Sequence, residues 1–439
     1  MQWIYSALVL LVLYGDLLKR VLSPIVSLLT LYAIAIVILA AVVWRCGAEA
    51  PRMSREGRLA HLAISSLILL YISQLLTSFS SPFIEGMSHA VYMCIPLAYI
   101  WVLQRCCKEF DIAALGQWFF IFMIPVNAVG LIQYYVDPNF LISTAYSEEG
   151  GIIIRDFLGG GKAFARFPSI FASADRYSAM GLMHLYFAVI VLKDSKHPSR
   201  CPKLWLLFNL VSSIAALFIA GARSRILIAS ASAAAMAVTF VFAAMFSRKY
   251  QVGKALFALA VPLLVVVFLF GFPLEPDFPP EVPIDEPFPV VTFLVQSAEH
   301  DDFTKRIVEA VEMSLFPEEI TFLGQGLGTV WEGKPGEFGI WSIWTESGLV
   351  WGSLIIIAFL LFVIALLVAT LKSFLAMSPL DVTIRLTSLL LIIFALLAGL
   401  TSSFELSSGV LLGCILAVTL RSSGNKGAGG SVGVLSIQH

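Results

Sequence analysis

The chain has 439 residues, of which 59% are hydrophobic and 13% are charged, and its formal net charge is −1. Water-soluble domains stay near half apolar, so this composition excludes an ordinary soluble domain and indicates a protein with many membrane spans. Because positive and negative charges nearly balance, we expect no nucleic-acid partner.

Long apolar runs are spread along the whole chain. A helix needs about 20 apolar residues to cross roughly 30 Å of hydrocarbon. Because runs of this length exclude a β-barrel, we expect an all-α polytopic membrane protein with about 12 transmembrane helices. No cleavable-signal pattern precedes the first run, so we expect that run to be retained. The expected spans are 2–18, 21–44, 60–78, 88–105, 113–136, 177–193, 204–221, 225–246, 253–271, 346–371, 384–401 and 404–421.

Lys and Arg gather in alternate short loops between these runs. Alternate loops share one side of the membrane, and an excess of Lys and Arg marks the cytoplasmic side, so both termini are expected in the cytoplasm. Lys19 and Arg20 depart from this rule. No cysteine falls in an expected outer loop, so we expect neither a disulfide framework nor structural zinc. The residues that set the orientation are Arg45, Arg52, Arg55, Arg58, Arg105, Lys108, Lys193, Lys196, Arg200, Lys203, Arg248, Lys249, Lys254, Lys372 and Arg385.

The segment 271–345 is the one long polar stretch, and we expect it to be the largest outer loop. Acidic residues greatly outnumber basic ones in it. Its first part is rich in proline and should be extended, whereas 303–315 carries apolar residues at helical spacing. We expect residues 1–421 to form a single membrane domain and the Gly/Ser-rich residues 422–439 to form a disordered cytoplasmic tail.

Two arginines, Arg223 and Arg225, lie in a very tight outer connection between two apolar runs. A guanidinium at membrane depth costs about 2.5–3.5 kcal/mol on insertion scales. An anionic ligand would offset this cost, and the planar fork of arginine matches phosphate oxygens in a bidentate manner. The alternative is that both side chains reach lipid headgroups or cap a neighbouring helix end.

Further basic candidates lie in the outer segments. Arg166 and Arg176 flank the sequence FPSIFASAD, and Lys162 follows three glycines that could wrap a phosphate or simply give flexibility. Arg306 lies in the large loop and could instead pair with acidic residues one turn later on its own helix. Lys162, Arg166 and Arg176, with Arg223 and Arg225, are the candidates for binding an anionic phosphate group.

Glu346 opens the expected span 346–371 in the sequence ESGLVWG. Its carboxylate could act as a general base, or it could cap the N-terminus of its own helix, where the dipole favours negative charge. His300 is the one histidine of the large loop and could also act as a base, since histidine titrates near neutral pH. No D-x-D pattern stands out in the loops, so the sequence names no metal ligand, and a requirement for a divalent metal is left open.

Several of these segments, taken in order, resemble the bacterial O-antigen polymerase and O-antigen ligase superfamily. The resemblance lies in RFPSIFASAD from Arg166, in Ser224-Arg225 followed by small residues, in Arg306, in GQGLGT from Gly324, and in ESGLVWG from Glu346. The chain departs from the family pattern at Ser169, where the family has Gly, and at Ser173 and Asp175, where it has Asn.

The resemblance implies a GT-C-like glycosyltransferase in the bacterial inner membrane, with the outer loops 137–176 and 271–345 forming the active site. Such enzymes take a glycan from undecaprenyl pyrophosphate in the periplasm. Ligases transfer it to lipid A–core and carry a His before the Glu-x-Gly segment; here Glu337 lies near that place and no His is present. The polymerase is therefore favoured, and the ligase is the alternative. Implied partners are the lipid-linked oligosaccharide, membrane lipids, a chain-length regulator and a flippase.

The expected chemistry needs no cofactor. A sugar diphosphate already has a good leaving group, so the site must mainly stabilise the charge that develops on the pyrophosphate, which Arg225, Arg166 and Arg306 would do. One base near the acceptor hydroxyl, Glu337 or Glu346, would complete an inverting displacement. A polysaccharide transporter remains a less favoured alternative, since twelve spans also suit carriers. Carriers usually have two halves related by a repeat. The single large loop makes the two halves of this chain unequal, which does not favour a carrier.

Overall fold

The computed structural model describes residues 2–21, 24–46, 55–77, 83–106, 111–137, 140–141, 154–156, 163–165, 167, 169–171, 174–193, 203–220, 322–324, 326 and 339–373. Its elements are α1 (Gln2–Val21), α2 (Pro24–Cys46), α3 (Arg55–Thr77), α4 (Phe83–Cys106), α5 (Ile112–Tyr135), β1 (Ile154–Asp156), β2 (Ala163–Ala165), α6 (Ala174–Lys193), α7 (Lys203–Ala220) and α12 (Gly339–Ser373).

The helices coincide with eight of the expected spans. Three of them contain segments that are long and apolar enough to cross a membrane: Arg55–Leu76, Ile112–Tyr135 and Glu346–Ala369. The chain is therefore a helical membrane protein. The expected spans 225–246, 253–271, 384–401 and 404–421 lie outside the described residues, so the number twelve stays a prediction.

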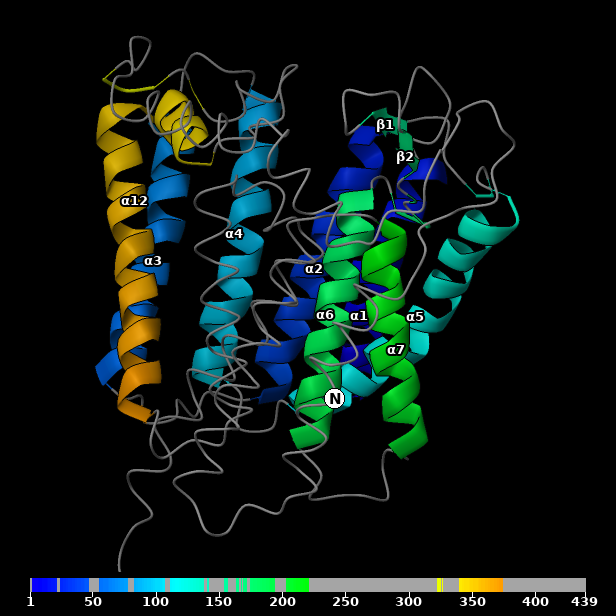
Figure 1. The fold of residues 1–439 in the computed structure, drawn as a ribbon. Helices are drawn as coiled ribbons and strands as arrows, with labels where there is room; N and C mark the ends of the chain where they lie inside the picture. Colours follow the sequence, from blue (N-terminus) through cyan, green and yellow to red (C-terminus); the bar gives the residue numbers. More distant parts are fainter. Residues whose placement is uncertain are drawn as a thin grey trace, which may run out of the picture.

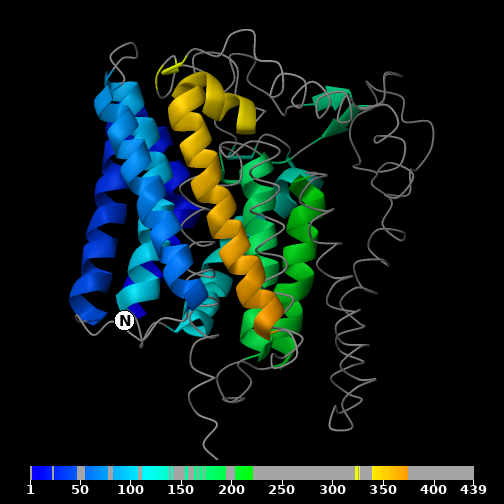
Figure 2. The same cartoon turned by 90° about the vertical axis from the view of Figure 1, so that its left-hand side faces the viewer.

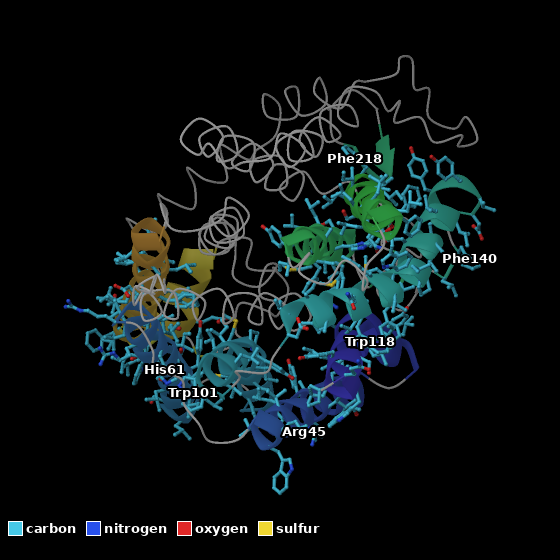
Figure 3. All side chains as sticks on the ribbon, turned by 90° about the horizontal axis from the view of Figure 1, so that it is seen from below. Arg45, His61, Trp101, Trp118, Phe140 and Phe218 are labelled. Atoms are coloured by element: carbon cyan, nitrogen blue, oxygen red, sulfur yellow. The ribbon has the colours of Figure 1, made fainter. Side chains whose placement is uncertain are left out.

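The described helices lie side by side and form a row (Figure 1). The main contacts link α12 to α3, α3 to α4, α4 to α2, α2 to α1, and α1 to α5, after which α5, α6 and α7 pack on one another. The row thus has a group of α3, α4 and α12 at one end and a group of α5, α6 and α7 at the other. Figure 3 shows the same separation, with His61 and Trp101 on one side of the molecule and Phe140 and Phe218 on the other.

Local interactions explain how the row is held. The Asp111 carboxylate caps α5 by accepting from the backbone N–H groups of Ala113 (3.0 Å) and Ala114 (3.2 Å), as an N-cap residue does. The backbone N–H of Asp111 donates to the Tyr5 hydroxyl at 2.8 Å, which ties the start of α5 to α1. In the other group, the Trp101 indole N–H donates to Ser65 Oγ at 2.9 Å between α4 and α3.

Apolar side chains also cover much of the outside of the helices. Trp44 is 89% exposed and Val37 is 66% exposed, and exposed leucines and isoleucines occur on α3, α5 and α12. An apolar surface of this extent would aggregate in water. It is the surface expected where helices meet lipid.

A short hairpin adds to the all-α fold that the sequence predicts. Strands β1 and β2 pair antiparallel, with Ile154 opposite Ala165 and Asp156 opposite Ala163. They lie on either side of the glycine run, where we expected only a loop. The hairpin and the start of α12 lie at the same end of the bundle, opposite the N-terminus (Figure 1).

Candidate functional site

Helix α12 is broken near its start. Gly348 has non-helical backbone angles (φ 68°, ψ −176°), which divide α12 into a short segment, 339–347, and a long one, 349–373. Figure 2 shows the short segment turned away from the axis of the long one. Gly352 has space only for hydrogen, because a Cβ there would lie 2.5 Å from Trp344 Cδ1. The short segment can therefore fold back closely on the long one.

Residues 322–324 and 326 lie across this break. In an unbroken helix, Val350 N–H would donate to the carbonyl of Glu346, four residues earlier. Instead, Val350 N–H donates to the Phe322 carbonyl (3.3 Å), and the Glu346 carbonyl accepts from Gly326 N–H (3.0 Å). The crossing segment therefore supplies partners for backbone groups that the break would leave unpaired in a low-dielectric region.

Glycine is required on both sides of this crossing. Gly324 has a φ of 85° and Gly348 a φ of 68°, conformations that side chains disfavour. A Cβ on Gly324 would overlap the Glu346 carbonyl oxygen, and a Cβ on Gly348 would overlap the Gly324 backbone nitrogen. The two sequence segments GQGLGT and ESGLVWG thus meet through backbone that only glycine permits.

A glutamine from α3 completes the arrangement. Gln74 is fully buried. Its Nε2 donates to the Glu346 carbonyl at 3.1 Å, and its Oε1 accepts from the Ser347 hydroxyl at 2.9 Å. We call this set of contacts among Gln74, residues 322–324 and 326, and residues 346–350 the Gln74 joint.

The Gln74 joint surrounds an ionisable side chain. Glu346 is only 6% exposed, and Tyr71, one turn before Gln74 on α3, is also buried. An acidic residue in a membrane-spanning segment is costly and usually marks a functional site. The structure thus places the predicted residue Glu346 at the start of its span, held by α3.

A second irregular segment is held on the other side of the molecule. The described residues of 167–171 are buried, and Phe167 N–H donates to the Ile219 carbonyl of α7 at 3.2 Å. Gln133 of α5 accepts from Ser169 N–H (2.8 Å) and donates to the Ser169 and Phe140 carbonyls (2.9 and 2.8 Å). We call these contacts the Gln133 joint.

Ser169 adopts a backbone conformation typical of glycine. Its φ is 54°, a left-handed conformation that costs a non-glycine residue about 1–2 kcal/mol. Its hydroxyl donates to the Val126 carbonyl at 2.6 Å, which offsets part of this cost. Ser169 is one of the positions where the chain departs from a family glycine, and the conformation is the one that a glycine would adopt without strain.

Arg176 lies beside this joint, in the first turn of α6, and is half-buried. Its neighbour Tyr177 donates to Asn127 Oδ1 at 3.1 Å, and Asn127 Nδ2 donates to Ser212 Oγ at 2.5 Å. These bonds link α6 to α5 and α7 just below Arg176. The first turn of α6, which carries Arg176, is therefore firmly placed.

The other predicted site residues lie outside the described residues. They are Lys162, Arg166, Arg223, Arg225, His300, Arg306 and Glu337. Among the described residues, no group of three His, Cys, Asp or Glu side chains could hold a metal ion.

Sequence reasoning missed Gln74, Ser347 and Gln133. The available signal was a polar amide within an otherwise apolar span, which is unusual enough to examine as a buried hydrogen-bonding group. No protein-family model matches the chain, and no curated protein sequence matches it.

Proposed function

We propose that this protein is a membrane glycosyltransferase that polymerises oligosaccharide repeat units carried on undecaprenyl pyrophosphate. The observation that carries the proposal is the Gln74 joint. It brings together the two segments, GQGLGT and ESGLVWG, on which the resemblance to the polymerase and ligase superfamily partly rests. It also places a buried carboxylate, that of Glu346, where they meet.

The proposed reaction is an inverting displacement. An acceptor sugar hydroxyl on one lipid-linked unit attacks the anomeric carbon of the other, and the bond from that carbon to the pyrophosphate oxygen breaks. The proton of the hydroxyl passes to a carboxylate, Glu346 or Glu337. Arginine side chains stabilise the pyrophosphate as it leaves. The candidates are Arg225, Arg223, Arg166, Arg176, Arg306 and Lys162.

The placement of basic residues supports a periplasmic site in the bacterial inner membrane. Arg45, at the end of α2, and Arg55 and Arg58, at the start of α3, lie at the same end of the bundle as the N-terminus. An excess of basic residues marks the cytoplasmic side. The Gln74 joint, the hairpin and Arg176 lie at the opposite end and would face the periplasm.

The chemistry of the acceptor separates a polymerase from a ligase. The stretch between Gly328 and Glu346 contains no His, which favours the polymerase. A chain-length regulator and a flippase would then be its working partners. In a strain that lacks the gene, we expect surface glycan with a single repeat unit. Bare acceptor together with long chains on the carrier lipid would instead identify a ligase, and lipid-linked units trapped in the cytoplasm would identify a transporter.

Arg225 provides a residue-level test of the same proposal. If its guanidinium binds the pyrophosphate in the transition state, Arg225→Lys should lower the rate about a hundred- to a thousandfold, because an ammonium keeps the charge but loses the planar fork. Glycan product and membrane-extracted protein are measured together for the wild type, Arg225→Lys and Arg225→Ala. Near-normal product from Arg225→Lys would show that Arg225 only anchors the protein at the headgroups.

A further inference from the structure

The carbonyl of Glu346 is the acceptor that the break in α12 leaves without its helical donor. Two separate groups replace that donor, Gly326 N–H at 3.0 Å and Gln74 Nε2 at 3.1 Å. The first comes from a neighbouring loop and the second from a different membrane helix. The peptide that follows the Glu346 side chain is therefore held to α3 as well as to residues 322–326.

The orientation of the Gln74 amide follows from its second contact. Its oxygen accepts from the Ser347 hydroxyl at 2.9 Å, so its nitrogen is the end that faces the Glu346 carbonyl. Both ends of one buried amide thus bind two successive residues, Glu346 and Ser347. An apolar side chain could fill the same space between α3 and α12, but it could not hold this peptide in one orientation.

Tyr71 lies three residues before Gln74, on the same face of the helix, and both side chains are buried. This face of α3 therefore packs inside the protein, and through Gln74 it binds the main chain of Glu346.

We propose that Gln74 is a positioning residue, which holds the Glu346 peptide so that its carboxylate points toward the acceptor hydroxyl. The expected effect on catalysis rests on the proposed function, whereas the expected effect on the orientation of the Glu346 side chain does not. Loss of the Gln74 amide should let the Glu346 side chain move, with little change in how the enzyme binds its lipid-linked donor.

The test uses the full-length protein purified in detergent and returned to lipid vesicles. Gln74→Met removes both hydrogen bonds and keeps an unbranched side chain of similar length, and Gln74→Asn keeps the amide but shortens its reach by one methylene. The matched control is Ser65→Ala, on the same helix, which removes the hydrogen bond from Trp101 but lies away from Glu346. Thermal unfolding of each variant reports whether it is folded.

The first measurement needs no catalytic activity. An apolar carbodiimide is added to vesicles, and its attachment to Glu346 is followed by mass spectrometry. We expect Gln74→Met and Gln74→Asn to change the rate of attachment several-fold, and Ser65→Ala to leave it unchanged. Equal rates in all variants would overturn the inference, even if the wild type transferred no sugar.

The second measurement separates rate from binding. With undecaprenyl-pyrophosphate-linked oligosaccharide as substrate, we expect Gln74→Met to lower kcat about tenfold, which corresponds to loss of about one well-placed hydrogen bond. KM for the donor should stay within about twofold, since interactions made only in the transition state affect kcat. A fall in kcat equal to that of Ser65→Ala would overturn the inference. An inactive wild type would overturn the proposed function alone.

Discussion

The Gln74 joint and the Gln133 joint are built in the same way but hold different kinds of residue. In each, a fully buried glutamine satisfies backbone groups of an irregular segment that lies among membrane helices. The Gln133 joint holds Ser169 among aromatic and aliphatic side chains, whereas the Gln74 joint holds an acidic residue. Under the proposed function, the Gln133 joint mainly maintains the shape of the protein, whereas the Gln74 joint also serves the chemistry.

The partners of the two glutamines differ in the same sense. Gln133 makes three hydrogen bonds to main-chain groups and uses both ends of its amide. Its partners, Ser169 and Phe140, are neutral. Gln74 instead bonds to the peptide of a residue that can carry or accept a proton. Loss of the Gln133 hydrogen bonds should therefore lower the free energy of unfolding, whereas loss of the Gln74 hydrogen bonds should lower the rate of glycan transfer.

The largest expected effect is at Glu346. Replacement by Gln keeps the size of the side chain and removes the proton acceptor, so the rate should fall by roughly 10²–10⁴-fold if the carboxylate is the general base. The free energy of unfolding should stay close to that of the wild type. Glycan formation by the purified variant in vesicles measures the effect. A rate near normal would mean that Glu346 acts only through the helix dipole, and the two joints would then be alike.

The next effect concerns Gln133. Gln133→Met leaves the Ser169 N–H and the Ser169 and Phe140 carbonyls without their partner, which should lower the free energy of unfolding by roughly 2–3 kcal/mol. The rate per folded molecule should change less than twofold. Unfolding in mixed detergent and transfer assays on the folded fraction give the two values. A variant that is as stable as the wild type but slow would show that both joints position catalytic groups.

The smallest effect is expected at Ser169. Ser169→Gly removes the strain of a positive φ, worth about 1–2 kcal/mol, but loses the hydrogen bond to Val126, worth about 0.5–1.5 kcal/mol. The two changes should nearly cancel. Ser169→Ala loses the bond and keeps the strain, so it should be less stable by about 1 kcal/mol. If Ser169→Ala is the more stable of the two in the same unfolding experiment, the backbone at this position is not strained.

The sequence predicted the eight described helices well, because each depends on a local apolar run. The start of α12 was predicted less well. The long apolar run begins after Glu346, but the helix already begins at Gly339. The residues between these two positions mix polar and apolar side chains and follow glycines, so the sequence did not predict that they are helical. Gly348 is the one visible sign of the break, and a glycine within an apolar run does not by itself distinguish a break from close packing.

The joints themselves could not be predicted. Gln74 and Glu346 are 272 residues apart in the chain, and no local spacing relates them. The polar residues were visible within the apolar runs, but their partners depend on how the helices pack. For the candidate site, the sequence predicted Glu346 and Arg176, which the structure places in the two groups of helices, and the remaining candidates lie outside the described residues.

The break in α12 has a consequence for the depth of Glu346 in the bilayer. A straight helix of 35 residues would be about 52 Å long, far more than the roughly 30 Å of hydrocarbon. Without a break, such a helix would have to tilt strongly or stretch the bilayer around it. With the break, the 24-residue segment Glu346–Ala369 is long and apolar enough to span by itself, and we expect hydrophobic matching to place Glu346, its first residue, near the boundary between acyl chains and headgroups. Vesicles of longer or shorter lipids would shift this boundary relative to Glu346, so we expect bilayer thickness to change how readily the sugar of a lipid-linked unit reaches the carboxylate.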